Sequence, residues 1–191
     1  MKARDIPNLI SILRILLVAP TVYYLLNEEY ILALVLFIIA GASDGVDGFL
    51  ARYFRWQSRL GAILDPIGDK LLLISCYLAM GWLGHIPVSL IVLVLLRDII
   101  IVAGAVAYHI YIEEVLIEPV LISKFNTLSQ ILLIVILLFD LSGVFHSDFI
   151  TDSLMSNFIW LVYITTAISG VVYMWLWGKR ALQKIHNGAA S

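Results

Sequence analysis

Long apolar runs alternate with short polar breaks along the whole chain. Each run has about the 20 residues that an α-helix needs to cross the hydrocarbon core of a bilayer. Six such runs can be distinguished, at approximately 7–27, 31–52, 62–83, 87–109, 124–145 and 156–177. The pattern therefore predicts an all-α integral membrane protein with six transmembrane helices.

The composition also indicates a membrane protein rather than a water-soluble one. Hydrophobic residues make up 62% of the 191 positions and charged residues only 14%, whereas soluble domains are about half apolar and about a quarter charged. The short loops leave no room for a separate soluble domain, so we expect residues 1–191 to form a single transmembrane domain. Asn8, Ser11 and Arg14 interrupt the first run, which favours a retained helix over a cleaved signal peptide.

The basic residues predict how the chain is oriented in the membrane. If the six runs alternate in direction, the basic clusters all fall on one side, and the opposite loops near 28–29, 82–87 and 140–152 contain no Lys or Arg. By the positive-inside rule, both termini are then cytoplasmic. The formal net charge of −2 gives no reason to expect a nucleic-acid partner.

Four aspartates interrupt the apolar pattern of two neighbouring runs. Asp44 and Asp47 lie near the cytoplasmic end of the second run, and Asp65 and Asp69 lie at the start of the third. An uncompensated carboxylate inside a membrane costs several kcal/mol, so four of them need partners. At about 100° per residue, each pair shares one helix face, and the two faces can meet across the helix pair.

Two kinds of partner can balance these four carboxylates. A divalent cation suits them well, because all-oxygen ligation favours Mg²⁺, Mn²⁺ or Ca²⁺ over zinc. The alternative is ordinary ion pairing, with Asp44 and Asp47 beside Arg52 or Arg55, and Asp65 and Asp69 beside Arg59 or Lys70. Small residues flank the acids and leave space for a bulky polar ligand or for close helix contact.

The spacing of these residues also resembles a family signature. The stretch Asp44-Gly-Val-Asp47-Gly48-Phe-Leu-Ala51-Arg52, eight further residues and Gly61-Ala-Ile-Leu-Asp65-Pro-Ile-Gly-Asp69 match the pattern D-x2-D-G-x2-A-R-x8-G-x3-D-x3-D. This pattern is the signature of the CDP-alcohol phosphatidyltransferases, and all eight fixed positions are met. The opening Ile6-Pro7-Asn8 with Arg14 is similar to the start of the family branch that makes glycerophospholipids.

The resemblance implies a reaction and a set of site residues. It implies transfer of a phosphatidyl group from CDP-diacylglycerol to an alcohol with release of CMP, and two divalent cations, Mg²⁺ or Mn²⁺, in each site. Asp44, Asp47, Asp65 and Asp69 would bind the cations, and Asp69 would also accept the proton of the acceptor hydroxyl. The residues that would line the CDP site are Gly48, Ala51, Arg52 and Gly61.

Two basic residues are candidates for binding the acceptor. Arg97 lies near the middle of the fourth run beside Asp98, and Lys124 begins the fifth run. Within the family they resemble basic residues of phosphatidylglycerophosphate synthases, which places glycerol 3-phosphate first as acceptor. Two local features are more similar to cardiolipin synthases, which use phosphatidylglycerol: the pair Arg97-Asp98 and the segment Ser123-Lys-Phe-Asn-Thr127. A buried structural role for Arg97 and an interfacial anchor role for Lys124 are the other interpretations.

Further alternatives stay open at this stage. Inositol phosphate or serine is a less favoured acceptor, and a divalent-cation transporter or a structural membrane subunit is a different class of function. A transporter predicts acidic residues that continue to the far side, but the four aspartates gather at one face. We expect the active site at the cytoplasmic face, in a bacterial inner membrane, in contact with membrane lipid. Ala103 and Ala107, one turn apart, would suit a homodimer contact.

Overall fold

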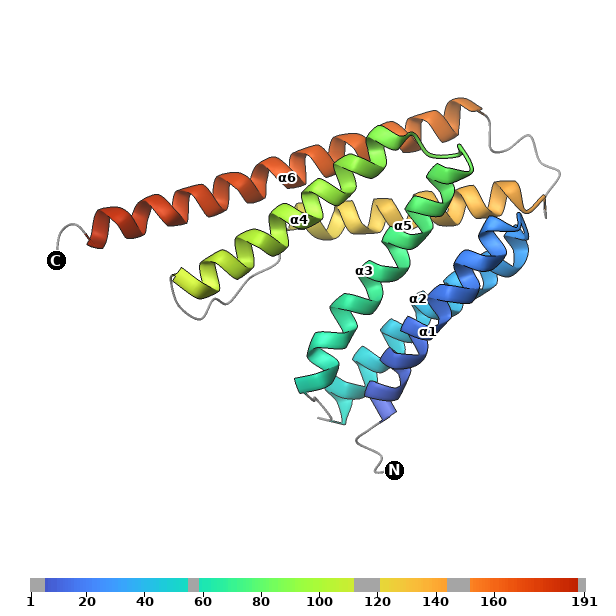
Figure 1. Cartoon of the computed structure of the whole chain (residues 1–191), viewed down its shortest axis with the longest axis horizontal. Helices are drawn as coiled ribbons and strands as arrows, with labels where there is room; N and C mark the ends of the chain where they lie inside the picture. The colour runs from blue at the N-terminus through green and yellow to red at the C-terminus, as the bar shows by residue number, and fades with distance from the viewer. Residues whose placement is uncertain (1–5, 55–58, 112–120, 144–151, 189–191) are drawn as a thin grey trace. The chain divides into compact units, whose positions relative to one another are not determined.

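The computed structural model describes residues 6–54, 59–111, 121–143 and 152–188, and all secondary structure within these ranges is helical (Figure 1). Within these ranges, the side chains that lie outside the described residues are those at 6–8, 44, 46–52, 59–66, 105–111, 152 and 180–188. The six helices of the described ranges are α1 (Ile6–Leu26), α2 (Tyr30–Tyr53), α3 (Arg59–Trp82), α4 (Val88–Tyr111), α5 (Leu121–Leu141) and α6 (Asp152–Gly188).

The predicted all-α architecture is confirmed, and each predicted run lies mainly on one helix. The largest differences are at the C-terminal helices. Helix α5 ends at Leu141, before the predicted 145, because Gly143 has a φ of 62° that a helix does not continue through. Helix α6 continues to Gly188, beyond the predicted 177. Hydropathy reports the apolar length of a helix, so it does not detect a polar extension.

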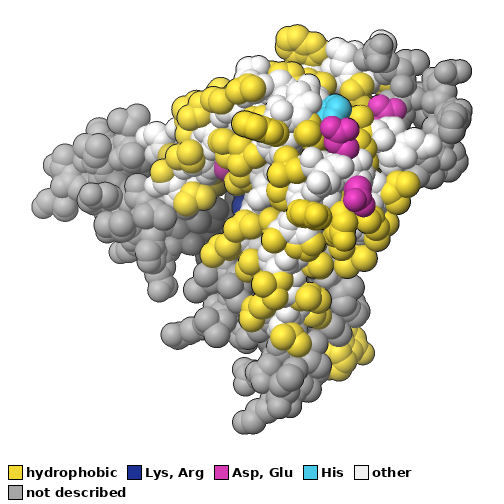
Figure 2. All heavy atoms as spheres, turned by 45° about the vertical axis from the view of Figure 1, so that its right-hand side comes forward, with side chains coloured by type: hydrophobic (Ala, Val, Ile, Leu, Met, Phe, Trp, Pro, Cys, Tyr) yellow, Lys and Arg dark blue, Asp and Glu magenta, His cyan; other side chains and the backbone are white. Residues whose placement is uncertain are grey.

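The described helices include segments long and apolar enough to cross a membrane. Three qualify within the described residues: Leu9–Leu26, Leu121–Leu141 and Ser153–Lys179. Helix α2 adds a shorter apolar stretch at Tyr30–Ser43. Apolar side chains cover much of the described part of the face shown in Figure 2, and many large ones are exposed, such as Leu16 and Val171. A surface of this kind is stable against lipid and unfavourable in water.

The chain divides into two compact units. The first contains residues Met1–Ile86 and Ile134–Ile150. In it, α1 packs on both α2 and α3, and α2 also contacts α3; Figure 1 shows α1 and α2 side by side. Its core is formed by fully buried side chains of these helices, including Leu25, Phe37, Cys76 and Met80. This packing brings the helices of the four aspartates into one bundle with α1.

The second unit contains residues Pro87–Leu133 and Thr151–Ser191. Helix α4 packs along α6 in this unit (Figure 1). Apolar side chains such as Leu90, Val94 and Val162 are buried there. Polar side chains are buried as well, among them Arg97 and Ser169. Because a buried polar group in a membrane helix needs a partner, this unit has an internal hydrogen-bond network.

Gly104 allows α4 and α6 to approach closely. A Cβ atom at this position would lie 2.5 Å from Nε1 of Trp177, so Gly104→Ala forces the indole ring or a helix to move. We expect the substitution to destabilise the protein by about 1–3 kcal/mol, the usual cost of overpacking. Thermal unfolding of the purified protein in detergent measures it as a lower Tm. Gly178→Ala is the matched control, because the space beside Gly178 is open; an equal loss in both variants would contradict the packing argument.

Candidate functional site

The four aspartates lie on two helices that contact each other. Asp44 and Asp47 lie in the C-terminal half of α2, and Asp65 and Asp69 lie in the N-terminal half of α3. Helical periodicity places the members of each pair on one face of their helix. The side chains of Asp44, Asp47 and Asp65 lie outside the described residues, as do those of the predicted CDP-binding residues Gly48, Ala51, Arg52 and Gly61.

Asp69 is the member of the set whose side chain is described. Its side chain is 49% exposed, so it is partly accessible. Its Oδ1 accepts a hydrogen bond from NH1 of Arg14 at 2.5 Å, and the Arg14 side chain is 0% exposed. The local pattern offered only Arg59 or Lys70 as partners for Asp69, whereas the structure adds an arginine from α1, 55 residues away in sequence.

Gly68 explains how the Arg14 side chain reaches Asp69. A Cβ atom at Gly68 would lie 3.5 Å from Cδ of Arg14 and 3.4 Å from Cγ1 of Ile15. The aliphatic part of Arg14 therefore lies directly against the backbone of α3, one residue before Asp69. A glycine here brings α1 and α3 close together, as small residues do between membrane helices. The guanidinium is consequently held beside the carboxylate by the packing of its own side chain.

The chemistry of the aspartates fits divalent cations. Four carboxylates on two contacting helices form an all-oxygen donor set, which is the type that Mg²⁺ and Mn²⁺ prefer. Within the described side chains no group of three or more His, Cys, Asp or Glu residues could hold a metal ion, and Asp69 is the only one of the four that these side chains include. The donor types fit the cations, and the metal site stays a prediction.

Arg97 lies in a buried polar cluster of the second unit. It is 3% exposed, and its NH1 donates to Oδ1 of Asp98 at 2.6 Å. Its Nε donates to Oγ of Ser169 at 3.1 Å and its NH2 donates to Oγ of Ser123. The ring of Tyr173 lies 5.9 Å from the guanidinium carbon. These contacts are those of a structural arginine paired with Asp98, and the acceptor-binding role of Arg97 stays a prediction.

Lys124 differs from Arg97 because its side chain is exposed, near the start of α5. An exposed ammonium group is accessible to an anionic ligand. Two residues further on, Asn126 is fully buried and its Oδ1 accepts hydrogen bonds from Thr165 at 3.0 Å and Thr166 at 2.8 Å. Gln130 donates to the same Thr166 at 3.4 Å. Lys124 therefore lies at the edge of a polar contact between α5 and α6.

Sequence reasoning missed part of this polar network. Ser123, Ser169 and Thr165 received no role, although their hydroxyls contact Arg97 or Asn126. The available signal was the spacing of polar residues four apart within apolar helices, as in Asn126 and Gln130 on α5. This spacing places both side chains on one helix face.

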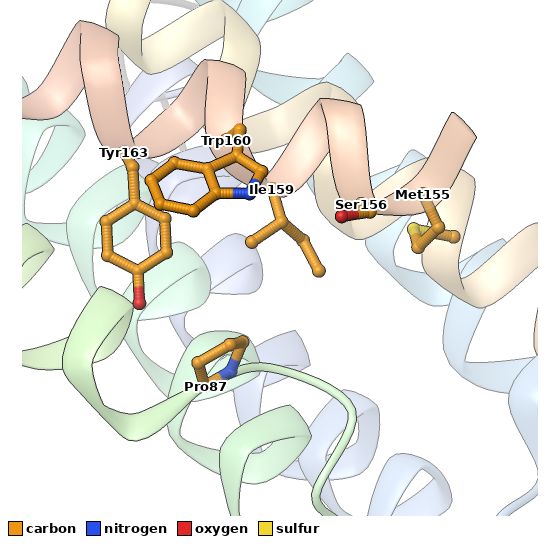
Figure 3. A pocket seen from close by; sticks show the side chains of 6 residues that line it. All are labelled: Pro87, Met155, Ser156, Ile159, Trp160 and Tyr163. Carbon is orange, nitrogen blue, oxygen red and sulfur yellow. The ribbon is translucent and has the colours of Figure 1, made fainter. Parts of the chain in front are cut away.

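A hollow of about 440 Å³ in the second unit does not match the candidate site. Figure 3 shows Ile159 and Tyr163 extending from α6 toward Pro87, and the lining is completed by Met155, Ser156 and Trp160. Its polar groups are hydroxyls and an indole nitrogen, and Tyr163 already pairs with Ser89 at 2.5 Å. Without a carboxylate or a cation, this lining cannot balance the charge of a diphosphate or of a divalent cation.

Comparison with known proteins identifies the family of this arrangement. The sequence model for CDP-alcohol phosphatidyltransferases matches residues 4–177, a range that includes all four aspartates, Arg14, Arg97 and Lys124. The match therefore extends well beyond the 26-residue signature and covers most of the described helices.

Individual relatives are similar over most of this chain. A cardiolipin synthase (CMP-forming) of Rattus norvegicus is 33% identical over 94% of this chain and 63% of its own length. A chloroplastic CDP-diacylglycerol--glycerol-3-phosphate 3-phosphatidyltransferase of Oryza sativa is 32% identical over 88% of this chain and 56% of its own length. The CDP-diacylglycerol--glycerol-3-phosphate 3-phosphatidyltransferase of Aquifex aeolicus is 32% identical over 65% of this chain and 70% of its own length. The chain thus spans less than two thirds of the rat and rice relatives.

Proposed function

The chain belongs to the CDP-alcohol phosphatidyltransferase family, and on that premise we propose that it transfers a phosphatidyl group from CDP-diacylglycerol to a glycerol-based acceptor and releases CMP. The observation that carries this proposal is the complete eight-residue signature on two contacting helices, inside a family match over residues 4–177. The names of relatives that are about one third identical describe this type of reaction.

The proposed chemistry assigns a task to each group of residues. The acceptor oxygen forms a bond to the phosphatidyl phosphorus, the bond from this phosphorus to the bridging oxygen breaks, and CMP leaves with that oxygen. Asp69, half exposed at the surface of its unit, takes the proton of the acceptor hydroxyl. Gly48, Ala51, Arg52 and Gly61 bind the CDP part of the donor. Two divalent cations, Mg²⁺ or Mn²⁺, held by the four aspartates would neutralise the diphosphate charge.

The named relatives differ in the acceptor that their names indicate. The resemblance of Arg97 and Lys124 to basic residues of phosphatidylglycerophosphate synthases places glycerol 3-phosphate first, as in the names of the rice and Aquifex relatives. Two observations favour phosphatidylglycerol. The rat cardiolipin synthase matches 94% of this chain, more than the rice or Aquifex relatives do. The charge of Arg97 is already balanced by Asp98, so Lys124 is the exposed cation of the two candidates. A single exposed cation matches the one charge of a phosphodiester better than the two charges of a phosphomonoester.

The placement in the membrane is part of the proposal. We propose that all six helices cross the bilayer, with both termini and the aspartates on the cytoplasmic side. The shortest of these helices have 21 residues, which is enough to span the hydrocarbon core, and the basic residues outside the helix centres fall on one side. The location in a bacterial inner membrane stays a prediction. So does the homodimer, for which Ala103 is exposed on α4 while Ala107 lies outside the described side chains.

One assay tests the reaction and the acceptor together. The purified protein, reconstituted with CDP-diacylglycerol and Mg²⁺ or Mn²⁺, is incubated separately with phosphatidylglycerol, glycerol 3-phosphate, inositol phosphate and serine. We expect CMP release that requires a divalent cation, stops with EDTA and is fastest with phosphatidylglycerol. Formation of phosphatidylglycerophosphate without cardiolipin would reverse the acceptor assignment. Absence of CMP release with every acceptor, together with cation flux into liposomes, would indicate a transporter instead.

A further inference from the structure

Arg14 is a buried charge within an apolar helix. It lies in the membrane-span candidate Leu9–Leu26 and is 0% exposed. A charged side chain in such a segment is costly unless a partner compensates it, so its partner indicates its role. Among the described side chains, Arg14 pairs with Asp69 through an NH1–Oδ1 contact of 2.5 Å.

The two members of this pair differ in their surroundings. The Arg14 side chain is fully enclosed, and its stem packs against Gly68. The Asp69 side chain is 49% exposed. The arginine therefore cannot reach a substrate from where it lies, whereas the carboxylate that it holds can. An enclosed guanidinium with a packed stem restrains the orientation of its carboxylate partner, because the hydrogen bond has a preferred direction.

We propose that Arg14 is a positioning residue for phosphatidyl transfer, holding the Asp69 carboxylate in the orientation that accepts the acceptor proton. This inference rests on the proposed function, since it concerns the same carboxylate. Arg14 acts through Asp69 and does not contact substrate. The alternative is that Arg14 binds the diphosphate of the donor directly, and this predicts a different kinetic result.

The first experiment separates kcat from KM in Arg14→Gln. Misplacing a reacting group by about 1 Å costs up to roughly 100-fold in rate, so we expect kcat to fall about 10- to 100-fold. The KM for CDP-diacylglycerol should change less than about threefold, because donor binding does not involve Arg14. Arg14→Lys should recover part of the lost kcat, because lysine keeps the charge and one donor but not the planar guanidinium.

A second experiment uses the metal-free protein and needs no turnover. Arg14→Gln and Asp69→Asn should each lower Tm, because each removes the charged hydrogen bond between the two side chains. The double variant Arg14→Gln/Asp69→Asn should lose less Tm than the two single variants added together, because both changes remove the same ion pair. Strictly additive losses of Tm would show that Arg14 and Asp69 do not act as a pair and would overturn the inference.

Thr21→Val is the matched control for α1. Thr21 is also fully buried on this helix, but its hydroxyl donates to the Leu17 carbonyl of its own helix at 2.7 Å. Its kcat should equal that of the wild type, measured per folded protein. An equal kcat loss in Thr21→Val would overturn the positioning role in favour of a general effect of helix α1.

The remaining outcomes separate this inference from the proposed function. If the wild type releases CMP and Arg14→Gln keeps the full kcat, or raises only the KM for CDP-diacylglycerol, the positioning role is wrong and the proposed function stands. If the folded wild type releases no CMP with any acceptor, the proposed function is wrong and the positioning role is wrong with it.

Discussion

Asp69→Asn is expected to reduce kcat by about 10²- to 10⁴-fold, the usual contribution of a general base. The amide keeps the size of the side chain and a coordinating oxygen, but it cannot take a proton from the acceptor hydroxyl. CMP release from CDP-diacylglycerol at saturating acceptor measures the effect. Activity within about tenfold of the wild type, below the range for a general base, would contradict the assignment of Asp69.

The pairing of Asp69 with Arg14 makes a folding control necessary for this variant. Asp69→Asn replaces a charged hydrogen-bond acceptor of the buried guanidinium, which costs about 1.5–3 kcal/mol for a hydrogen bond to a charged group. Because Asp69 is half exposed and solvent screens the pair, we expect the loss of stability to lie at the lower end of this range. The Tm and the binding of CDP-diacylglycerol should therefore be measured beside kcat, so that lost base chemistry is separated from lost folded protein.

Lys124→Gln is expected to raise the KM of the acceptor about 10- to 100-fold, if Lys124 binds the acceptor phosphate through one charge-assisted hydrogen bond. The KM for CDP-diacylglycerol should change little, because the lost interaction belongs to one substrate. Because Lys124 is exposed, the substitution should leave Tm unchanged. Initial rates at varied acceptor concentration measure the shift.

Arg97→Gln gives the complementary result, because Arg97 is buried. If Arg97 binds the acceptor, its variant raises the acceptor KM as Lys124→Gln does. If Arg97 serves only as the partner of Asp98 and Ser169, the variant lowers Tm and leaves the acceptor KM unchanged. The control is Lys179→Gln, an exposed lysine that lies over the Trp175 ring in the same unit. An unchanged acceptor KM in both Lys124→Gln and Arg97→Gln would rule out the basic acceptor pocket.

Local chemistry was sufficient to predict the helices and the aspartate motif. Each of the six apolar runs lies mainly on one helix, because a helix satisfies the backbone hydrogen bonds of an apolar segment within that segment. The faces of Asp44, Asp47, Asp65 and Asp69 follow from helical periodicity alone. The boundaries of α5 and α6 were less accurate, because Gly143 ends one helix by its backbone conformation and polar residues extend the other.

The amino-acid sequence by itself determined the class of protein, the helix order and the signature that identifies the family. Only the tertiary structure decided which charges meet. It pairs Asp69 with Arg14 across 55 residues, and it surrounds Arg97 with Ser123 and Ser169 from two other helices. Periodicity places a side chain on a face but does not determine which helix packs against that face. That choice depends on close contacts, such as the one Gly68 allows beside the Arg14 stem, and these form only when distant segments come together.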